Sequence, residues 1–305
     1  MSASLSAASF AAALPAAHEA AASQHYPQGA LYVVATPIGN LADITLRALH
    51  VLALVDAVAC EDTRHTQQLL RAYGMDRPAA QLLALHQHNE AEAAQAVIER
   101  LRLGQRIAYV SDAGTPAISD PGARLVAAVR AQGLRVLPLP GASSVTCALS
   151  AAGVTEDGGF VFAGFLPAKA GERGHAVEAL ARETRAVVLL EAPHRIAALA
   201  EALAALGERP VTVARELTKQ FEEIATLPAG QLPAWLDQAP QRQRGEFVLV
   251  LHAAPVAADA GEDLRVLRLL LAELPLKTAV KLAAEITGTA RNSLYDAALT
   301  IKQQG

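Results

Sequence analysis

The sequence predicts an α/β fold of two domains, with a mainly parallel sheet in the first domain, a mixed sheet in the second and a helical C-terminal extension. The chain has 305 residues, and at roughly 150 residues per domain that length suffices for two domains with cores of their own. From Ala30 onward, short apolar segments alternate with segments of helical periodicity. The apolar segments show no alternation of inward and outward positions, which is typical of parallel strands covered on both faces.

Changes in composition divide the chain into four units. Residues 1–28 are rich in Ala and Ser, and the first Lys or Arg is Arg47. We therefore expect a disordered tail rather than a signal peptide, which begins with positive charge. Gly153 and the pair Gly158-Gly159 are typical of a hinge between domains. The expected units are a tail over residues 1–28, a first α/β domain over 29–152, a second α/β domain over 153–254 and a C-terminal helical segment over 255–305.

The first domain begins with an apolar strand at residues 30–35, which ends at the breaker cluster Thr36–Asn40. Asp43 is expected to cap a helix that continues to about Leu54. Strands and helices then alternate along the chain, as a parallel sheet requires. Strands are expected over 57–60, 81–85, 106–110 and 134–139, and helices over 63–73, 90–103, 120–132 and 142–152.

In the second domain, strands are expected over 160–165, 186–190, 211–216, 220–226 and 247–252. The third and fourth of these are too close in sequence for a helical crossover, so we predict a hairpin and therefore a mixed sheet. Helices are expected between the first strands. Beyond Pro255, helices are expected over 263–273, 275–287 and 289–302.

Gly288 separates the last two expected helices in the pattern of a helix-turn-helix. From Gly261 to Gly305, six Lys and Arg residues stand against five Asp and Glu residues. That excess of positive charge is too small to establish nucleic-acid binding. A helical hairpin that docks on protein therefore remains the alternative.

The composition excludes several classes of protein. A net charge of −4 provides no general basic field for nucleic acid. The two cysteines, Cys60 and Cys147, form no CxxC pair, so we expect no disulfide framework, no zinc site and a cytoplasmic location. No apolar run reaches the roughly 18 residues of a membrane helix. His86 and His88 have no third ligand near them in sequence, so we expect no metal site.

Three loops at the carboxyl ends of the predicted parallel strands indicate a ligand site, because ligands of open α/β sheets bind at that edge. Rich in glycine, proline and small hydroxyl residues, the loops are TPIGN (36–40), SDAGTPAISDPG (111–122) and LPGASS (139–144). None of them has the GxGxxG or GxxxxGK[ST] spacing, so a phosphate cradle is not indicated. We expect a nucleoside-like or amino-acid-like ligand. Asp112 could pair with a cation or a ribose hydroxyl, whereas Asp120 is expected mainly to cap the next helix.

Seven motifs in a fixed order give the chain a family resemblance. They are YVVATPIGNLADITLRA, EDTRHT (61–66), SDAGTPAISDPG, LPGASS, GF-LP (164–167), EAPHRI (191–196) and ARELTK (214–219). Together they resemble the tetrapyrrole-methylase superfamily, methyltransferases whose two α/β domains hold S-adenosylmethionine in a cleft. Within it, EDTRHT and EAPHR resemble the 16S rRNA cytidine 2′-O-methyltransferases. The resemblance extends from Leu31 to the C-terminus.

The resemblance implies a tetrapyrrole-methylase-like fold and S-adenosylmethionine as cofactor. By motif position, the cofactor contacts are Pro37, Gly39, Ser111, Asp112, Ala113, Ser143, Ser144, Glu191 and Ala214. Two positions depart from the wider family. Many relatives carry a GxG first loop where this chain has Pro37 and Gly39, and relatives that act on tetrapyrroles often have an apolar residue at the position of Glu191.

The resemblance also implies an acceptor and an assembly. The implied acceptor is the ribose 2′-hydroxyl of a cytidine in the decoding centre of 16S rRNA, within the small ribosomal subunit, and the implied assembly is a homodimer. Two alternatives stay open. One is a methyltransferase of the same fold that acts on a tetrapyrrole or corrinoid precursor, and the other is a ligand-sensing DNA-binding regulator with a helix-turn-helix.

Methyl transfer to a ribose hydroxyl profits from a base that accepts or orients the proton. Asp62 and Glu61 are the best candidates, with His65 as a further possible base, and Arg64 beside them could neutralise an RNA phosphate. A plain ion pair between Glu61 and Arg64 at the helix start carries nearly equal weight. The expected RNA contacts are Arg64, His194, Arg195, Arg215 and Lys219. A salt-bridge network within the protein is the alternative for the residues of the second domain.

Overall fold

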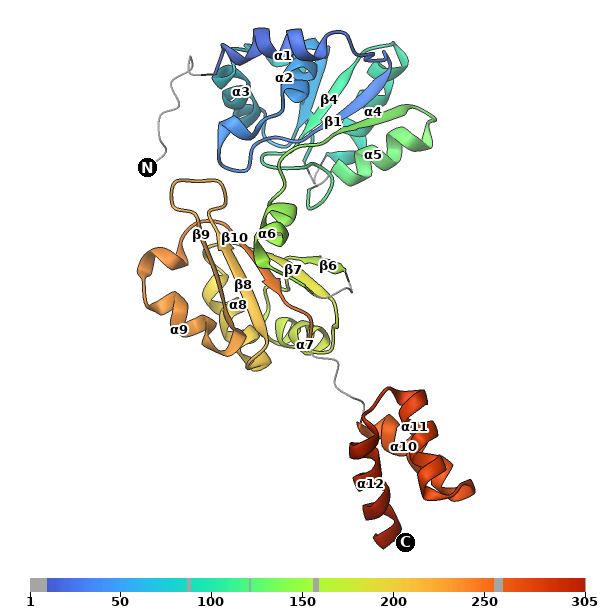
Figure 1. Cartoon of the computed structure of the whole chain (residues 1–305). Helices are drawn as coiled ribbons and strands as arrows, with labels where there is room; N and C mark the ends of the chain where they lie inside the picture. The colour runs from blue at the N-terminus through green and yellow to red at the C-terminus, as the bar shows by residue number, and fades with distance from the viewer. Residues whose placement is uncertain (1–9, 87–88, 121, 156–158, 255–259, 305) are drawn as a thin grey trace.

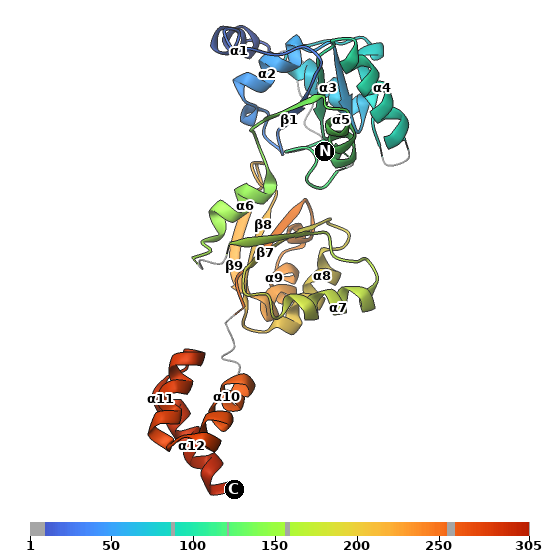
Figure 2. The ribbon, with the colours of Figure 1, turned by 90° about the vertical axis from the view of Figure 1, so that its right-hand side faces the viewer.

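The computed structural model describes residues 10–86, 89–120, 122–155, 159–254 and 260–304. Its strands form two five-stranded sheets, which follow one another along the molecule, with a group of three helices beyond the second sheet (Figure 1). A view at right angles shows the same succession (Figure 2). The predicted α/β architecture with a helical C-terminal extension is therefore confirmed.

All pairings in the first sheet are parallel. Its strands are β1 (Ala30–Val34), β2 (Ala57–Cys60), β3 (Leu82–Ala84), β4 (Ile107–Val110) and β5 (Arg135–Leu139), in the order β3-β2-β4-β1-β5. Every residue of β1, β2 and β4 is buried, which explains why these segments are apolar without alternation. Because β1 pairs with β4 and β5, the loops that follow these three strands leave the sheet side by side.

Helices cover both faces of this sheet. The helices α2 (Leu46–Leu54) and α3 (Thr63–Ala72) pack on one face. On the other face lie α4 (Glu90–Arg102) and α5 (Gly122–Ala131). Short 3₁₀ turns occur at Leu41–Asp43 and Ala79–Gln81.

The expected cap of α2 is wrong. Thr45 has extended backbone angles, and its hydroxyl accepts a hydrogen bond from the Ala48 amide at 3.1 Å, in the standard manner of an N-cap. Asp43 instead ends the 3₁₀ turn Leu41–Asp43. The tight turn before the helix uses Asp43, so the helix begins two residues later than expected.

The N-terminal region differs from the expected disordered tail. Helix α1 (Ala13–Ala21) packs against α2, with Ala17 and Ala21 buried. The following residues are tied to the sheet, because Tyr32 donates its hydroxyl to Pro27 O at 2.8 Å and Arg106 donates Nε to Tyr26 O at 3.1 Å. Residues 10–28 are therefore ordered, and residues 1–9 lie outside the described residues. Alanine allows close helix contact, but an alanine-rich composition does not distinguish such a helix from a linker.

The second sheet is mixed, as predicted. Its strands are β6 (Phe160–Gly164), β7 (Ala186–Glu191), β8 (Pro210–Arg215), β9 (Glu223–Pro228) and β10 (Phe247–Leu251), in the order β6-β7-β10-β8-β9. Strand β6 runs parallel to β7, and the remaining pairs are antiparallel. The predicted hairpin is formed by β8 and β9. Helices α7 (Ala170–Leu180), α8 (Ile196–Leu203) and α9 (Leu232–Asp237) cover one face, with 3₁₀ turns at Ala204–Leu206, Ala229–Gln231 and Pro240–Gln243.

Helix α6 (Ser144–Ala152) covers the other face of the second sheet. We expected this helix within the first domain, but Val145, Ala148 and Ala152 pack against Val188 and Val250 of the second sheet. The chain therefore leaves the first sheet before α6, in the loop LPGASS. That crossing places the start of α6 between the two sheets (Figure 1).

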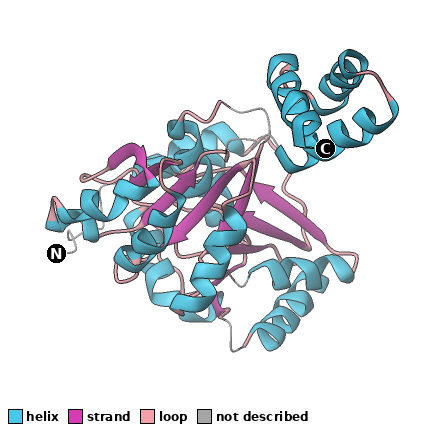
Figure 3. Cartoon of the chain, turned by 90° about the horizontal axis from the view of Figure 1, so that it is seen from below, coloured by secondary structure: helices cyan, strands magenta, loops and turns pink. Residues whose placement is uncertain are grey.

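The C-terminal helices are α10 (Ala260–Glu273), α11 (Leu276–Thr287) and α12 (Arg291–Gln304). They share a small core around Leu267, Val280 and Leu294. Gly288 ends α11 with φ +76°, the left-handed conformation in which glycine is favoured. Figure 3, seen from below, shows the three helices grouped apart from the strands. Among the described residues, no helix combines the length and apolarity needed to cross a bilayer.

The contact between α1 and α2 predicts a local dependence on pH. His50 of α2 is buried, with its ring 5.4 Å from that of His18 and 4.9 Å from that of Tyr26. His25 and Arg106 line the same hollow. Burial, and then the charge of His18, lowers the pKa of His50 below its ordinary value. Since the unfolded state binds the proton more readily, stability from this site is present above about pH 6.5 and is lost as the pH falls below it.

We expect the amides of α1 to lose protection against hydrogen exchange between pH 7.5 and 5.5, after correction for intrinsic exchange rates. His50→Gln should remove most of this dependence, whereas His65→Gln, at an exposed position of α3, should keep it. Equal loss of protection in wild type and His50→Gln would contradict the prediction.

Candidate active site

Two adjoining hollows lie where the first sheet meets the second. The larger, about 370 Å³, is lined mainly from the second sheet, by residues that include Glu191, Ala214, Phe247 and Val248. The smaller, about 230 Å³, is lined by the long loop after β4, by the start of α6 and by Glu61. Ala113, Ser119, Ser144 and Leu190 line both. The hollows therefore form one continuous site between the domains.

Hydrogen bonds to backbone groups hold the loops of this site together. Thr36 and Gly114 exchange two N–H···O bonds of 3.0 Å, and the Thr36 hydroxyl donates to Ser111 O at 3.2 Å. Thr115 donates its hydroxyl to Ala142 O at 2.9 Å. The loops after β1, β4 and β5 are thus joined in series. Gly114 has φ +82°, and a Cβ there would lie 3.2 Å from Ile38, so both conformation and space favour glycine.

Asp120 organises the end of the long loop. Its carboxylate accepts hydrogen bonds from the Ala117 amide, from the Gly122 amide at 2.8 Å and from the Tyr109 hydroxyl at 2.7 Å. The predicted role of Asp120 at the start of the next helix is therefore confirmed. Gly122 packs on the Tyr109 ring so closely that a Cβ would lie 1.9 Å from it.

Glu61 and Asp62 follow β2 and take different directions. Glu61 lines the smaller hollow with Asp112 and Asp120. Burial, and then the two neighbouring carboxylates, raises the pKa of Glu61 above its usual value. A carboxylate with a raised pKa is a stronger base than an ordinary one. Glu61 thus has both the location and the basicity to take a proton from a ligand in this hollow.

Asp62 caps α3. Its carboxylate accepts from the Arg64 amide at 2.8 Å and the His65 amide at 3.4 Å, and it pairs with the Arg64 side chain at 3.2 Å. These hydrogen bonds lower the pKa of Asp62. Arg64 lies on the outer side of α3, where it lines a separate hollow with Arg71 and Arg77. Asp62 and Arg64 thus form an ion pair at the start of α3, whereas the alternative expected from the sequence paired Arg64 with Glu61, which lines the hollow instead.

Glu191 carries an unpaired acceptor at the larger hollow. Its side chain is 1% exposed, and Oε1 accepts from the Ala192 amide at 2.9 Å and pairs with Arg195 Nε at 3.0 Å. Oε2 is buried without a protein partner. A buried carboxylate oxygen without a donor is costly, so this atom is placed to accept a hydrogen bond from a bound molecule. Ala214, at the end of β8, lines the same hollow with a small side chain.

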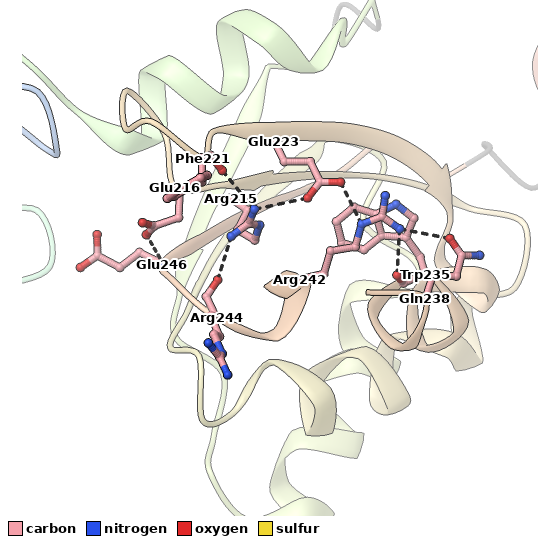
Figure 4. A network of polar contacts seen from close by, with 9 residues as sticks. All are labelled: Arg215, Glu216, Phe221, Glu223, Trp235, Gln238, Arg242, Arg244 and Glu246. Atoms are coloured by element: carbon pink, nitrogen blue, oxygen red, sulfur yellow. Dashed lines mark hydrogen bonds and ion pairs between the residues drawn. The ribbon is translucent and has the colours of Figure 1, made fainter. Parts of the chain in front are cut away.

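Arg215, one of the expected RNA contacts, is engaged within the protein. Arg215 has a side chain that is 7% exposed, and it donates to Phe221 O at 3.0 Å and to Arg244 O at 3.2 Å (Figure 4). Glu223 lies 3.4 Å from Arg215 and also pairs with Arg242. This arrangement is the internal salt-bridge network that the sequence left as an alternative.

Of the other expected RNA contacts of this domain, two form ion pairs within the protein and one is exposed. Lys219 pairs with Glu216 at 2.8 Å and with Glu246 at 3.0 Å. Arg195 pairs with Glu191 and donates Nη2 to Leu166 O. His194, in contrast, is exposed in the turn that precedes α8.

The first loop contributes differently from the expectation. A Cβ on Gly39 would lie 2.4 Å from Lys219 Cγ, so Gly39 allows the first domain to contact the turn Glu216–Lys219 of the second. That turn has φ +52° at Glu216 and +66° at Thr218. Ile38, between Pro37 and Gly39, is the residue of this loop that lines the hollow. The motif identified this loop, but only the contacts between the domains show which of its residues lines the hollow and which contacts the second domain.

Sequence reasoning missed several lining residues, chiefly Ile38, Ser119, Phe165, Leu190 and Leu217. Each lies in or beside one of the motifs that carried the resemblance. Their position in or beside these motifs was therefore the signal by which the sequence could have identified them. Most are apolar, however, and apolar residues beside a strand are ordinarily part of the core.

Two family models match the chain. Residues 30–233 match the model described as tetrapyrrole (corrin/porphyrin) methylases, and residues 257–302 match that described as RsmI C-terminal HTH domain. Ribosomal RNA small subunit methyltransferase I of Escherichia coli O157:H7 is 50% identical over 282 residues, covering 91% of this chain and 96% of the relative. The same enzyme of Neisseria meningitidis serogroup B is 45% identical over 291 residues, covering 94% and 99%.

Solved structures of low sequence identity share the fold. Cobalt precorrin-4 methyltransferase aligns with a TM-score of 0.54 at 19% identity, covering 74% of this chain and 98% of that chain. Uroporphyrin-III C-methyltransferase from Thermus thermophilus, in complex with S-adenosyl homocysteine, aligns with a TM-score of 0.50 at 18% identity, covering 73% and 96%. Both alignments agree with the arrangement of the two sheets.

The Arg215 network predicts a structural role that stability measurements can test. Arg215→Met should lower the free energy of unfolding by about 3 kcal/mol, because buried carbonyls and Glu223 lose their donor. Arg64→Ala, which removes an exposed ion pair, should lower it by less than about 1 kcal/mol. Urea denaturation of both variants provides the comparison. Unchanged stability of Arg215→Met with reduced RNA affinity would restore the RNA-contact role.

Proposed function

The chain belongs to the tetrapyrrole (corrin/porphyrin) methylase family, and from that premise we propose that it methylates the ribose 2′-hydroxyl of a cytidine in the decoding centre of 16S rRNA. It is an S-adenosylmethionine-dependent rRNA methyltransferase. The observation that carries the proposal is 50% identity to ribosomal RNA small subunit methyltransferase I across both the methylase region and the C-terminal helices. The tetrapyrrole and regulator alternatives are not favoured, because the relatives at this identity bear the rRNA enzyme's name.

The residues of the two hollows fit S-adenosylmethionine. The cofactor offers amino and hydroxyl donors, a carboxylate and an apolar purine, and the site offers the free Glu191 Oε2, small hydroxyl side chains and buried apolar walls. We assign cofactor binding to Ser111, Asp112, Ala113, Ser143, Ser144, Glu191 and Ala214. Pro37 and Gly39 support this site by holding Ile38 against it. When bound, the cofactor supplies the methyl group and a good leaving group.

Glu61 is the residue we assign to the acceptor hydroxyl. It faces the hollow from the end of β2, and its raised pKa suits it to accept the proton that the ribose hydroxyl loses during methyl transfer. Asp62 acts on this step indirectly, because its capping of α3 fixes the backbone that carries Glu61. The buried floor of the larger hollow, which includes Ala214, Phe247 and Val248, limits access of water from that side, and water would compete with the ribose hydroxyl.

The substrate is proposed to be the rRNA within the assembled small subunit. Arg64 and Arg71, on the outer side of α3, and the exposed His194 are the positions we assign to RNA contact. Arg195, Arg215 and Lys219 support the site from inside the protein. We also propose, from the family resemblance, that the protein is a homodimer, and we place it in the cytoplasm.

The direct test supplies labelled S-adenosylmethionine with three acceptors: small subunits from cells that lack this protein, free 16S rRNA, and uroporphyrinogen. We expect label in the small subunits, at a ribose 2′-oxygen of a cytidine located by nuclease digestion and mass spectrometry. Label confined to uroporphyrinogen would contradict the proposal. Cofactor binding without transfer to any acceptor would instead support the regulator.

Neighbouring carboxylates provide a matched test of the proposed base. Glu61→Gln should lower kcat by about 10²- to 10⁴-fold, the usual contribution of a positioned acid or base, with little change in cofactor affinity measured by calorimetry. Asp62→Asn keeps an oxygen that can cap α3 and should retain most of the activity. Equal loss in both variants, or full activity of Glu61→Gln, would show that Glu61 is not the base.

A further inference from the structure

Phe165 is an exposed aromatic residue of the larger hollow, in contrast to the buried residues that form its floor. It is 52% exposed, whereas Glu191, Ala214, Phe247 and Val248 of the same lining are at most 5% exposed. Phe165 therefore lies at the rim, with part of its ring in contact with solvent. An aromatic ring held half in water at the opening of a cavity is a surface available to a planar molecule.

The backbone around Phe165 is built to hold this position. The pairing of β6 with β7 shifts register between Phe162 and Gly164, and Gly164 has φ +63°. Such an irregularity changes the direction of the side chains that follow it. The side chain after Phe165 is that of Leu166, which is buried. The rim position of Phe165 thus results from a defined bend at the end of β6.

A hydrogen bond to the next residue, Leu166, holds the chain on the C-terminal side of Phe165. The carbonyl of Leu166 accepts a hydrogen bond from Arg195 Nη2, and Arg195 is itself paired with the buried carboxylate of Glu191. Arg195 therefore connects the floor of the hollow to its rim. In this structure Arg195 acts as a positioning residue for the segment that carries Phe165, which explains why an arginine of the EAPHRI motif faces the protein.

We propose that Phe165 is a stacking platform for a nucleobase of the acceptor RNA. This inference rests on the proposed function, because methylation of a ribose hydroxyl requires the acceptor nucleotide to be held apart from its neighbours, and exposed RNA bases commonly stack on aromatic side chains. The cofactor's purine is the other planar group at this site. The buried part of the hollow, lined by Ala214, Phe247 and Val248, suits a small molecule that is enclosed, whereas the rim suits a base that arrives on an RNA strand.

Phe160 provides a matched control at the other end of the same strand. It is also a phenylalanine, 50% exposed, and it begins β6 where Phe165 follows its end. Phe165→Ala should lower kcat/KM for small subunits by about 10- to 100-fold, the range expected for loss of one base–aromatic stack, while the Kd of S-adenosylmethionine stays unchanged. Phe160→Ala should leave both constants unchanged.

Two further variants separate stacking from simple apolar contact. Phe165→Tyr should retain kcat/KM within about threefold, because the ring face is kept, and Phe165→Leu should resemble the alanine variant. Retention of activity by Phe165→Leu would overturn the stacking role. A higher Kd for S-adenosylmethionine in Phe165→Ala would assign the ring to cofactor binding and would also overturn the stacking role.

The outcome for the wild-type protein distinguishes failure of this inference from failure of the proposed function. Labelling of small subunits by wild type together with full activity of Phe165→Ala would overturn the stacking role alone. Labelling of uroporphyrinogen in place of small subunits would overturn the proposed function and the base-stacking role with it.

Discussion

The pair of backbone hydrogen bonds between Thr36 and Gly114 is the contact on which the site depends. It joins the loop after β1 to the loop after β4, and Thr115 extends the connection to Ala142, just before α6. The two bonds between Thr36 and Gly114 run between backbone groups, so they leave the side chains of these loops free to face a ligand. The sheet order makes this possible, because β1 lies between β4 and β5 and brings the three loops to one edge.

The crossing of the chain from the first sheet to the second then places one helix in both parts of the site. Helix α6 begins at the loop of the first sheet and packs its apolar face on the second. Ser144 at its start consequently lines both hollows. The close contact of Gly39 with Lys219 is a second connection between the two domains beside the site. The two sheets are therefore held together at the site itself, where their relative position determines the shape of the cavity.

Local pattern was sufficient to predict the sheets, since continuous burial of β1, β2 and β4 requires apolar residues at every position. It was also sufficient to locate the three loops, because parallel strands present their carboxyl ends at one edge. Pattern could not assign α6 to a sheet, as its small apolar residues suit either. Nor could it show that Arg215 is buried, because an arginine beside acidic residues has the same sequence whether its partners are protein carbonyls or RNA phosphates. Those distinctions depend on contacts between residues distant in the chain.

The adjacent carboxylates Glu61 and Asp62 have different roles because their side chains point in opposite directions. Consecutive residues of an extended segment point in opposite directions, so one of the pair faces the hollow while the other faces away. Asp62 has extended backbone angles and turns its oxygen to the amides at the start of α3, and its own amide donates to Asp112 at 3.3 Å. With Asp62 fixed by the helix on one side and by the long loop on the other, Glu61 is held at the hollow, where burial and like charge raise its pKa. The same cap that starts α3 therefore orients the residue best placed to take the proton.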